Sequence, residues 1–155
     1  MLNKDFKEFF ALLACAQVEY LLVGGYALAA HGHPRYTGDI DIWVKPSAEN
    51  VTRLLGVLDE FGFRSLGLTA SDFMQPQAVI QLGYPPARID LLTSIDGVEF
   101  DACFARRQAL GVDGLSLNLI ALDDFRANKL ATGRAKDLAD LQSLDETPPG
   151  ASDLS

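Results

Sequence analysis

Two aspartates separated by one residue could hold a divalent metal ion. They lie in the segment Asp39-Ile40-Asp41-Ile42-Trp43-Val44, in which acids alternate with apolar residues. Alternate side chains of a strand leave the same face, so the two carboxylates would point together with their Cα atoms about 6 to 7 Å apart. Paired anions repel each other unless a cation lies between them, which favours a metal site. The alternative is an exposed strand whose acids face water.

A glycine pair upstream strengthens the case for a metal site. Gly24-Gly25 follows the apolar run Tyr20-Leu21-Leu22-Val23 and precedes helix-forming residues, which predicts a strand, a glycine turn and a helix. Backbone N–H groups at the start of a helix can bind phosphate. A phosphate bound at Gly24-Gly25 would then lie near a metal bound by Asp39 and Asp41. The alternative is a turn in which glycine only permits close packing.

The segments around these residues predict helices and strands in a mixed order. Asn3 and Ser47 are suitable N-caps for two helices whose apolar residues recur at three- and four-residue spacing. The turn Gly83-Tyr84-Pro85-Pro86 separates two apolar runs and predicts a hairpin. The expected helices cover residues 4–15, 48–60, 122–132 and 136–144, and the expected strands cover residues 20–23, 39–44, 76–82 and 87–92.

Residues 97–120 have a weaker pattern. Val98-Glu99-Phe100 is compatible with a strand, and residues 104–110 are compatible with either a helix or an irregular run. No repeat or linker divides the chain. We therefore expect one domain over residues 1–147, followed by a disordered tail over residues 148–155.

The composition indicates a globular protein without a membrane span. The chain has 155 residues, of which 48% are hydrophobic, and no apolar run approaches the roughly 18 residues that a membrane helix needs. The first residues do not resemble a secretory signal, so a cytoplasmic location is expected. Cys15 and Cys103 form neither a disulfide framework nor a zinc site, and both are expected to be buried thiols.

The charge distribution argues against broad binding to nucleic acid. Binding to nucleic acid requires a basic face that neutralises phosphates, and a protein with a net charge of −8 is not expected to have a broad one. A local basic segment remains compatible with this charge. Such a segment lies near the C-terminus, and Asp137 directly follows its last basic residue. Asp137 could orient Lys129 or Arg134 through an ion pair. Acids near a helix N-terminus are also common because of the helix dipole. The basic residues of this segment are Arg126, Lys129, Arg134 and Lys136.

Three segments in this order resemble a known group of proteins. Leu22-Val23-Gly24-Gly25 is followed after thirteen residues by Asp39-Ile40-Asp41-Ile42, Arg35-Tyr36-Thr37 precedes the acids, and residues 128–140 contain Lys-Leu and Arg-Ala-Lys-Asp. The arrangement resembles the DNA polymerase β-like nucleotidyltransferase superfamily, and within it the small bacterial AbiEii-type and minimal nucleotidyltransferases. The resemblance implies an α/β (α+β) fold with a small mixed sheet flanked by helices and a short C-terminal helical segment.

The resemblance also implies a third acid and two metal ions. Asp90, between apolar residues in Arg88-Ile89-Asp90-Leu91-Leu92, is the first candidate, and Asp101 is the alternative. Asp39, Asp41 and Asp90 would be the catalytic metal ligands, with Asp90 completing the site of the ion that activates the acceptor hydroxyl. The expected ion is Mg²⁺, with Mn²⁺ as the other candidate.

The nucleotide would be bound by residues outside the acid pair. By resemblance, Lys129 would lie near the triphosphate, but it could equally be a solvated helix lysine. Arg35 could contact phosphate or lie in a surface loop, and Thr37 could contact the nucleotide or only shape the turn. The residues expected to bind the nucleotide are Gly24, Gly25, Arg35, Thr37 and Lys129.

The implied activity is Mg²⁺-dependent transfer of a nucleoside monophosphate from a nucleoside triphosphate to a hydroxyl on RNA, protein or a small molecule. Two alternatives remain open. The chain could be the toxin of a toxin–antitoxin pair that uses this chemistry and binds an antitoxin-type protein. It could instead be an inactive nucleotide-binding regulatory module. Because little chain follows Asp90, a homodimer or partner protein could complete the acceptor site.

Overall fold

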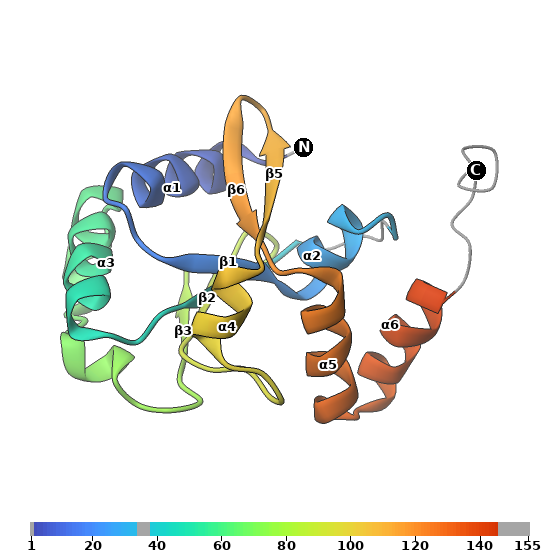
Figure 1. The fold of residues 1–155 in the computed structure, drawn as a ribbon. Helices are drawn as coiled ribbons and strands as arrows, with labels where there is room; N and C mark the ends of the chain where they lie inside the picture. The colour runs from blue at the N-terminus through green and yellow to red at the C-terminus, as the bar shows by residue number, and fades with distance from the viewer. Residues whose placement is uncertain (1, 34–37, 146–155) are drawn as a thin grey trace.

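The central feature of the structure is one mixed β-sheet (Figure 1). The computed structural model describes residues 2–33 and 38–145, and within them six strands lie in the order β3-β4-β2-β1-β6-β5. β1 pairs antiparallel with β2 and parallel with β6, whereas β2 pairs parallel with β4. The strands are β1 (Tyr20–Val23), β2 (Ile40–Val44), β3 (Val79–Leu82), β4 (Ile89–Leu92), β5 (Gln108–Val112) and β6 (Leu115–Leu119).

Helices lie on both sides of the molecule. Figure 1 shows α1 and α3 at one side, and α5 with α6 at the other. The predicted N-caps are confirmed, because the Asn3 side chain accepts a hydrogen bond from Phe6 N and the Ser47 side chain accepts one from Asn50 N. The helices are α1 (Lys4–Cys15), α2 (Gly24–Ala30), α3 (Ala48–Phe61), α4 (Phe100–Ala105), α5 (Leu122–Thr132) and α6 (Ala135–Asp145), with short 3₁₀ turns at Arg64–Leu66 and Ala70–Phe73.

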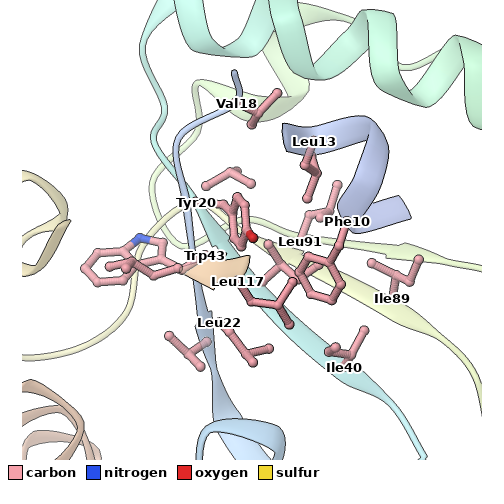
Figure 2. Packing of buried hydrophobic residues seen from close by; sticks show 14 of the residues in the cluster. Phe10, Leu13, Val18, Tyr20, Leu22, Ile40, Trp43, Ile89, Leu91 and Leu117 are labelled. Carbon is pink, nitrogen blue, oxygen red and sulfur yellow. The ribbon is translucent and has the colours of Figure 1, made fainter. Parts of the chain in front are cut away.

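The alternation of β2 separates the core from the acids. Ile40 and Ile42 are completely buried, as the period-two pattern predicted. On the same core, Phe10 of α1 packs against Tyr20 of β1 with their ring centroids 5.5 Å apart (Figure 2). Because these apolar side chains fix the strand on one face, the aspartates of the segment must leave on the other.

Residues 97–120 differ from the prediction. The strand that residues 98–100 were compatible with does not form: α4 begins at Phe100. The Phe100 ring packs against Trp43 and against Phe104, one helical turn later, with ring centroids 5.2 and 5.4 Å apart. Beyond α4, β5 and β6 form a hairpin that we did not predict. Its turn residues, Asp113 and Gly114, both have positive φ, as a type I′ turn requires.

The remaining elements agree with the sequence except in one cysteine. The hairpin of β3 and β4 and the two C-terminal helices are confirmed. Cys103 is buried, but Cys15 is exposed, so the expectation that both thiols are buried is wrong. The expected tail over residues 148–155 lies outside the described residues. In the part of the chain that the structure describes, no helix is both long enough and apolar enough to cross a membrane.

Candidate active site

Asp41 and Asp90 lie side by side on neighbouring parallel strands. Asp41 of β2 is in register with Asp90 of β4, and on its other side with Val23 of β1. Side chains of directly paired residues leave the same face of a sheet, so the two carboxylates are neighbours. Asp90 is only 7% exposed. The acid that the sequence suggested first as the third carboxylate is therefore beside Asp41.

Asp101, the alternative third acid, lies elsewhere. It is in the first turn of α4, is exposed, and pairs with Lys45 at 3.0 Å. The structure therefore brings Asp90, and not Asp101, to Asp41.

Asp39 is linked to Asp90, and so to the acid pair, through an arginine. It immediately precedes β2, and its Oδ1 accepts a hydrogen bond from Arg88 N at 3.2 Å. The Arg88 guanidinium lies 3.3 Å from Asp39 Oδ2 and donates to both oxygens of Asp90, at 2.7 and 3.1 Å. Asp39, Asp41 and Asp90 thus form one acid cluster with Arg88 against it. Arg88 was not predicted as a site residue, although residues 88 and 90 lie two apart and so point to the same side of an extended chain.

The acid cluster has the right donor atoms for magnesium, but Arg88 contacts two of its members. Carboxylate oxygens are the ligands that Mg²⁺ prefers. Within residues 2–33 and 38–145, however, no three His, Cys, Asp or Glu side chains are already arranged to hold a metal ion. The oxygens of Asp39 and Asp90 face the Arg88 guanidinium. Metal binding by these acids therefore remains a prediction that requires Arg88 to move.

Gly24 allows Asp41 to approach the end of β1. Its φ is +69°, a conformation that favours glycine, and a Cβ at this position would overlap Asp41 Oδ2. Gly24 and Gly25 begin α2, as predicted. Their proposed contact with phosphate stays a prediction. Arg35 and Thr37, which were expected to contact the nucleotide, lie outside the described residues.

A pocket of about 450 Å³ opens between the sheet and the two C-terminal helices. Gly24 and Asp41 lie on its sheet side, and Lys129 and Arg134 lie on its helix side. Its wall also includes polar residues that were not predicted from the sequence. Two of them, Asn128 and Thr132, are one helical turn apart on α5, and this spacing is a signal that could have found them. The other polar residues of the pocket wall that were not predicted are Gln77, Ser94 and Asp96.

Lys129 is buried and paired, so the alternative of a solvated helix lysine is wrong. It is 8% exposed, and its Nζ lies 3.1 Å from Asp137 Oδ1 and 3.4 Å from Asp140 Oδ2. Asp137 also accepts a hydrogen bond from Arg134 Nε at 2.7 Å, which confirms the predicted ion pairs. Burial raises the pKa of Asp137, but the hydrogen bonds from Arg134 and Lys129 outweigh it, and the pKa lies below its ordinary value.

Burial and the neighbouring Asp90 change the protonation of Asp41. Together they raise the pKa of Asp41 to about 6, while the positive charges of Lys129 and Lys136 act in the opposite direction. With a pKa of about 6, the Asp41 carboxyl would lose its proton to solvent when a cation binds beside it. This is the electrostatic environment expected of a site for a cation or an acid–base step.

Comparison with known proteins supports the fold. No protein-family model matches the chain, and no curated protein matches it in sequence. Among solved structures of similar fold are two that match over nearly their whole length. A proposed nucleotidyltransferase from Thermotoga maritima, TM1012, has a TM-score of 0.61 at 15% identity, covering 92% of this chain and 93% of that one. The lincosamide antibiotic adenylyltransferase LnuA with lincomycin bound has a TM-score of 0.54 at 13% identity, covering 94% and 98%.

These comparisons show a nucleotidyltransferase-like fold, as the resemblance implied. At such low identity they show the fold alone. Membership of the AbiEii-type group stays a prediction.

Gly24→Ala should destabilise the protein. A left-handed conformation costs a residue with a Cβ about 1 to 2 kcal/mol, and displacement of the Asp41 carboxylate adds to that. Gly56→Ala is the matched control, because Gly56 lies within α3 with no atom near the new Cβ. Urea unfolding should show a loss for Gly24→Ala and no loss for Gly56→Ala. Equal stability of the two variants would contradict this account of Gly24.

Asp41→Asn should stabilise the metal-free protein at pH 7. The folded state binds the Asp41 proton more tightly than the unfolded state, so this group costs stability as the pH rises from about 4 to about 6. The free energy of unfolding of Asp41→Asn at pH 7 should exceed that of the wild type by more than about 1 kcal/mol, since one pKa unit corresponds to about 1.4 kcal/mol. This difference should shrink towards pH 4. Urea unfolding in EDTA tests this, with Asp101→Asn as control; a gain that does not change with pH would contradict it.

Proposed function

We propose that the protein is a Mg²⁺-dependent nucleotidyltransferase that moves a nucleoside monophosphate from a nucleoside triphosphate to a hydroxyl group. The observation that carries the proposal is the in-register pair of Asp41 and Asp90, linked to Asp39 through Arg88, with Asp41 lining a pocket whose opposite wall carries Lys129 and Arg134. The fold shared with TM1012 and LnuA supports it.

The reaction exchanges one phosphorus–oxygen bond for another. The acceptor oxygen forms a bond to the α-phosphorus, the bond from that phosphorus to the oxygen bridging the β-phosphate breaks, and pyrophosphate leaves with the electron pair. The hydroxyl proton passes to a carboxylate of the acid cluster and from there to solvent. Little covalent chemistry is required of the protein beyond positioning and charge stabilisation.

The acid cluster would hold the metal ions. Bound by Asp39, Asp41 and Asp90, Mg²⁺ would neutralise charge on the transferred phosphoryl group and on the leaving pyrophosphate. Mn²⁺ has similar ligand preferences and is the second candidate.

The helix side of the pocket would receive the triphosphate. Lys129 and Arg134 lie there, both oriented by Asp137, and Arg134 remains 69% exposed. Asp137 and Asp140 partly offset their charge, so this wall attracts an anion less strongly than free lysines would. A triphosphate that carries a divalent cation suits a pocket with acids on one side and balanced cations on the other.

A small-molecule hydroxyl is the acceptor class that we favour. LnuA, whose structure contains lincomycin, matches over 98% of its chain, and this chain extends over a similar length. The net charge of −8 disfavours RNA as acceptor, because RNA carries many phosphates. Transfer to a protein or RNA would instead support the toxin alternative, and an antitoxin-type partner or a homodimer would then be expected to complete the site.

Labelled transfer tests the activity directly. The protein is incubated with each α-labelled nucleoside triphosphate, Mg²⁺ or Mn²⁺, and separate pools of hydroxylated small molecules, RNA and protein. We expect label in the small-molecule pool, and a loss of about a hundredfold or more in Asp41→Asn and in Asp90→Asn. Asp101→Asn, an exposed acid outside the cluster, should retain activity. Nucleotide binding without any transfer would indicate the inactive binding module instead.

Arg134→Gln should weaken triphosphate binding about threefold to tenfold, because the pocket loses an exposed cation. The matched control is Arg107→Gln, since Arg107 is exposed and stacks on Phe104, away from the pocket. Calorimetry at low and high salt should show that the difference between Arg134→Gln and the wild type shrinks as salt rises. Equal losses in both variants would argue against a specific role for Arg134.

A further inference from the structure

Arg88 is held beside the acid cluster by its backbone as well as its side chain. Its N–H donates to Asp39 Oδ1 at 3.2 Å, and its carbonyl accepts from Ile40 N at 3.0 Å. These contacts fix the start of β4 against the start of β2. Residues 88 and 90 alternate along an extended chain, so the Arg88 side chain leaves on the same face as Asp90. Its position therefore follows from the pairing of the two strands.

The guanidinium bridges two acids of the cluster. It lies 3.3 Å from Asp39 Oδ2, and 2.7 and 3.1 Å from the two oxygens of Asp90. The exposed fractions of the three side chains are 24% for Arg88, 30% for Asp39 and 10% for Asp90. Bidentate charge-assisted hydrogen bonds in such partly buried places are among the stronger polar contacts in proteins. A metal ion bound by both carboxylates would need the same oxygens.

We propose that Arg88 is the built-in counter-ion of the acid cluster and competes with the divalent cation for Asp39 and Asp90. This inference rests on the proposed function, because it concerns the metal site of that activity. Without metal, the guanidinium offsets the repulsion among three carboxylates. A divalent cation at the same oxygens is repelled by the guanidinium and takes its ligands, so the side chain must leave as the ion binds. Arg88 thereby sets the metal affinity.

Calorimetric titration with Mn²⁺ alone tests the competition. Arg88→Gln removes the charge and should bind Mn²⁺ at least about tenfold more tightly, which is the scale of one lost charge-assisted hydrogen bond. Arg53→Gln is the matched control. Arg53 pairs with Glu49 at 2.6 Å on α3, outside the acid cluster, so this variant should bind like the wild type. An Arg88→Gln affinity equal to or below that of the wild type would overturn the proposal.

Melting temperatures give a second readout that a merely structural arginine would not share. In EDTA, Arg88→Gln should melt below the wild type, because the acids lose their counter-ion. In saturating Mn²⁺ the difference should close, since the ion replaces that charge. A deficit of the same size in both conditions would count against the proposal. If Arg88→Gln does not fold, Arg88→Lys should show a smaller gain in Mn²⁺ affinity of the same sign, and no gain would overturn the inference.

The titration separates the metal site from the competition by Arg88. If neither the wild type nor Arg88→Gln binds Mn²⁺, the metal site of the proposed function is wrong, and the inference that rests on it falls as well. If the wild type binds Mn²⁺ and Arg88→Gln binds it no more tightly, the metal site stands and only the competition by Arg88 is wrong. Binding by Arg88→Gln but not by the wild type would support both.

Discussion

Much of this structure depends on two carboxylates that the sheet holds together against their mutual repulsion. Asp41 and Asp90 face each other because β2 and β4 are paired in register, and buried residues on the opposite face, such as Ile40 and Ile42, prevent the strands from slipping. A slip of one residue would turn those isoleucines to solvent. The core therefore holds the two acids together, and burial of Asp41, together with the neighbouring Asp90, raises its pKa to about 6.

Cations from separate segments of the chain partly neutralise this excess of negative charge. Arg88 comes from the start of β4 and binds two of the acids, while Lys129 on α5 faces the pocket from the other side. Lys129 has partners of its own in Asp137 and Asp140, so it is buried without leaving an unpaired charge. Each wall of the pocket therefore has its own ion pairs: Arg88 neutralises part of the acid cluster, and Asp137 and Asp140 neutralise Lys129. Such a pocket suits a substrate that itself combines a polyphosphate with a divalent cation.

Local chemistry allowed most of the fold to be predicted, but not all of it. Asn3 and Ser47 are caps that act within their own turns, and the helices after them were found correctly. The hairpin of β5 and β6 was missed, although Asp113-Gly114 is a strong turn signal and apolar and polar residues alternate from Leu115 to Leu119. The signal is weaker in β5, because Ala109 and Gly111 have low β propensity. Residues 98–100 were compatible with a strand, but Phe100 begins a helix and packs against Trp43, a contact with a distant strand that outweighs the local β preference.

The sequence by itself determined which groups are present and which of them share a face. The spacing of Asp39 and Asp41, the glycines at the end of an apolar strand, and the basic segment near the C-terminus all follow from neighbouring residues. Only the tertiary structure decided that Asp90 and not Asp101 meets Asp41, that Arg88 bridges Asp39 to Asp90, and that Lys129 is buried between two acids. These contacts depend on strand order and register, and Asp39 and Arg88 are 49 residues apart. Local propensity and periodicity do not encode which strands become neighbours.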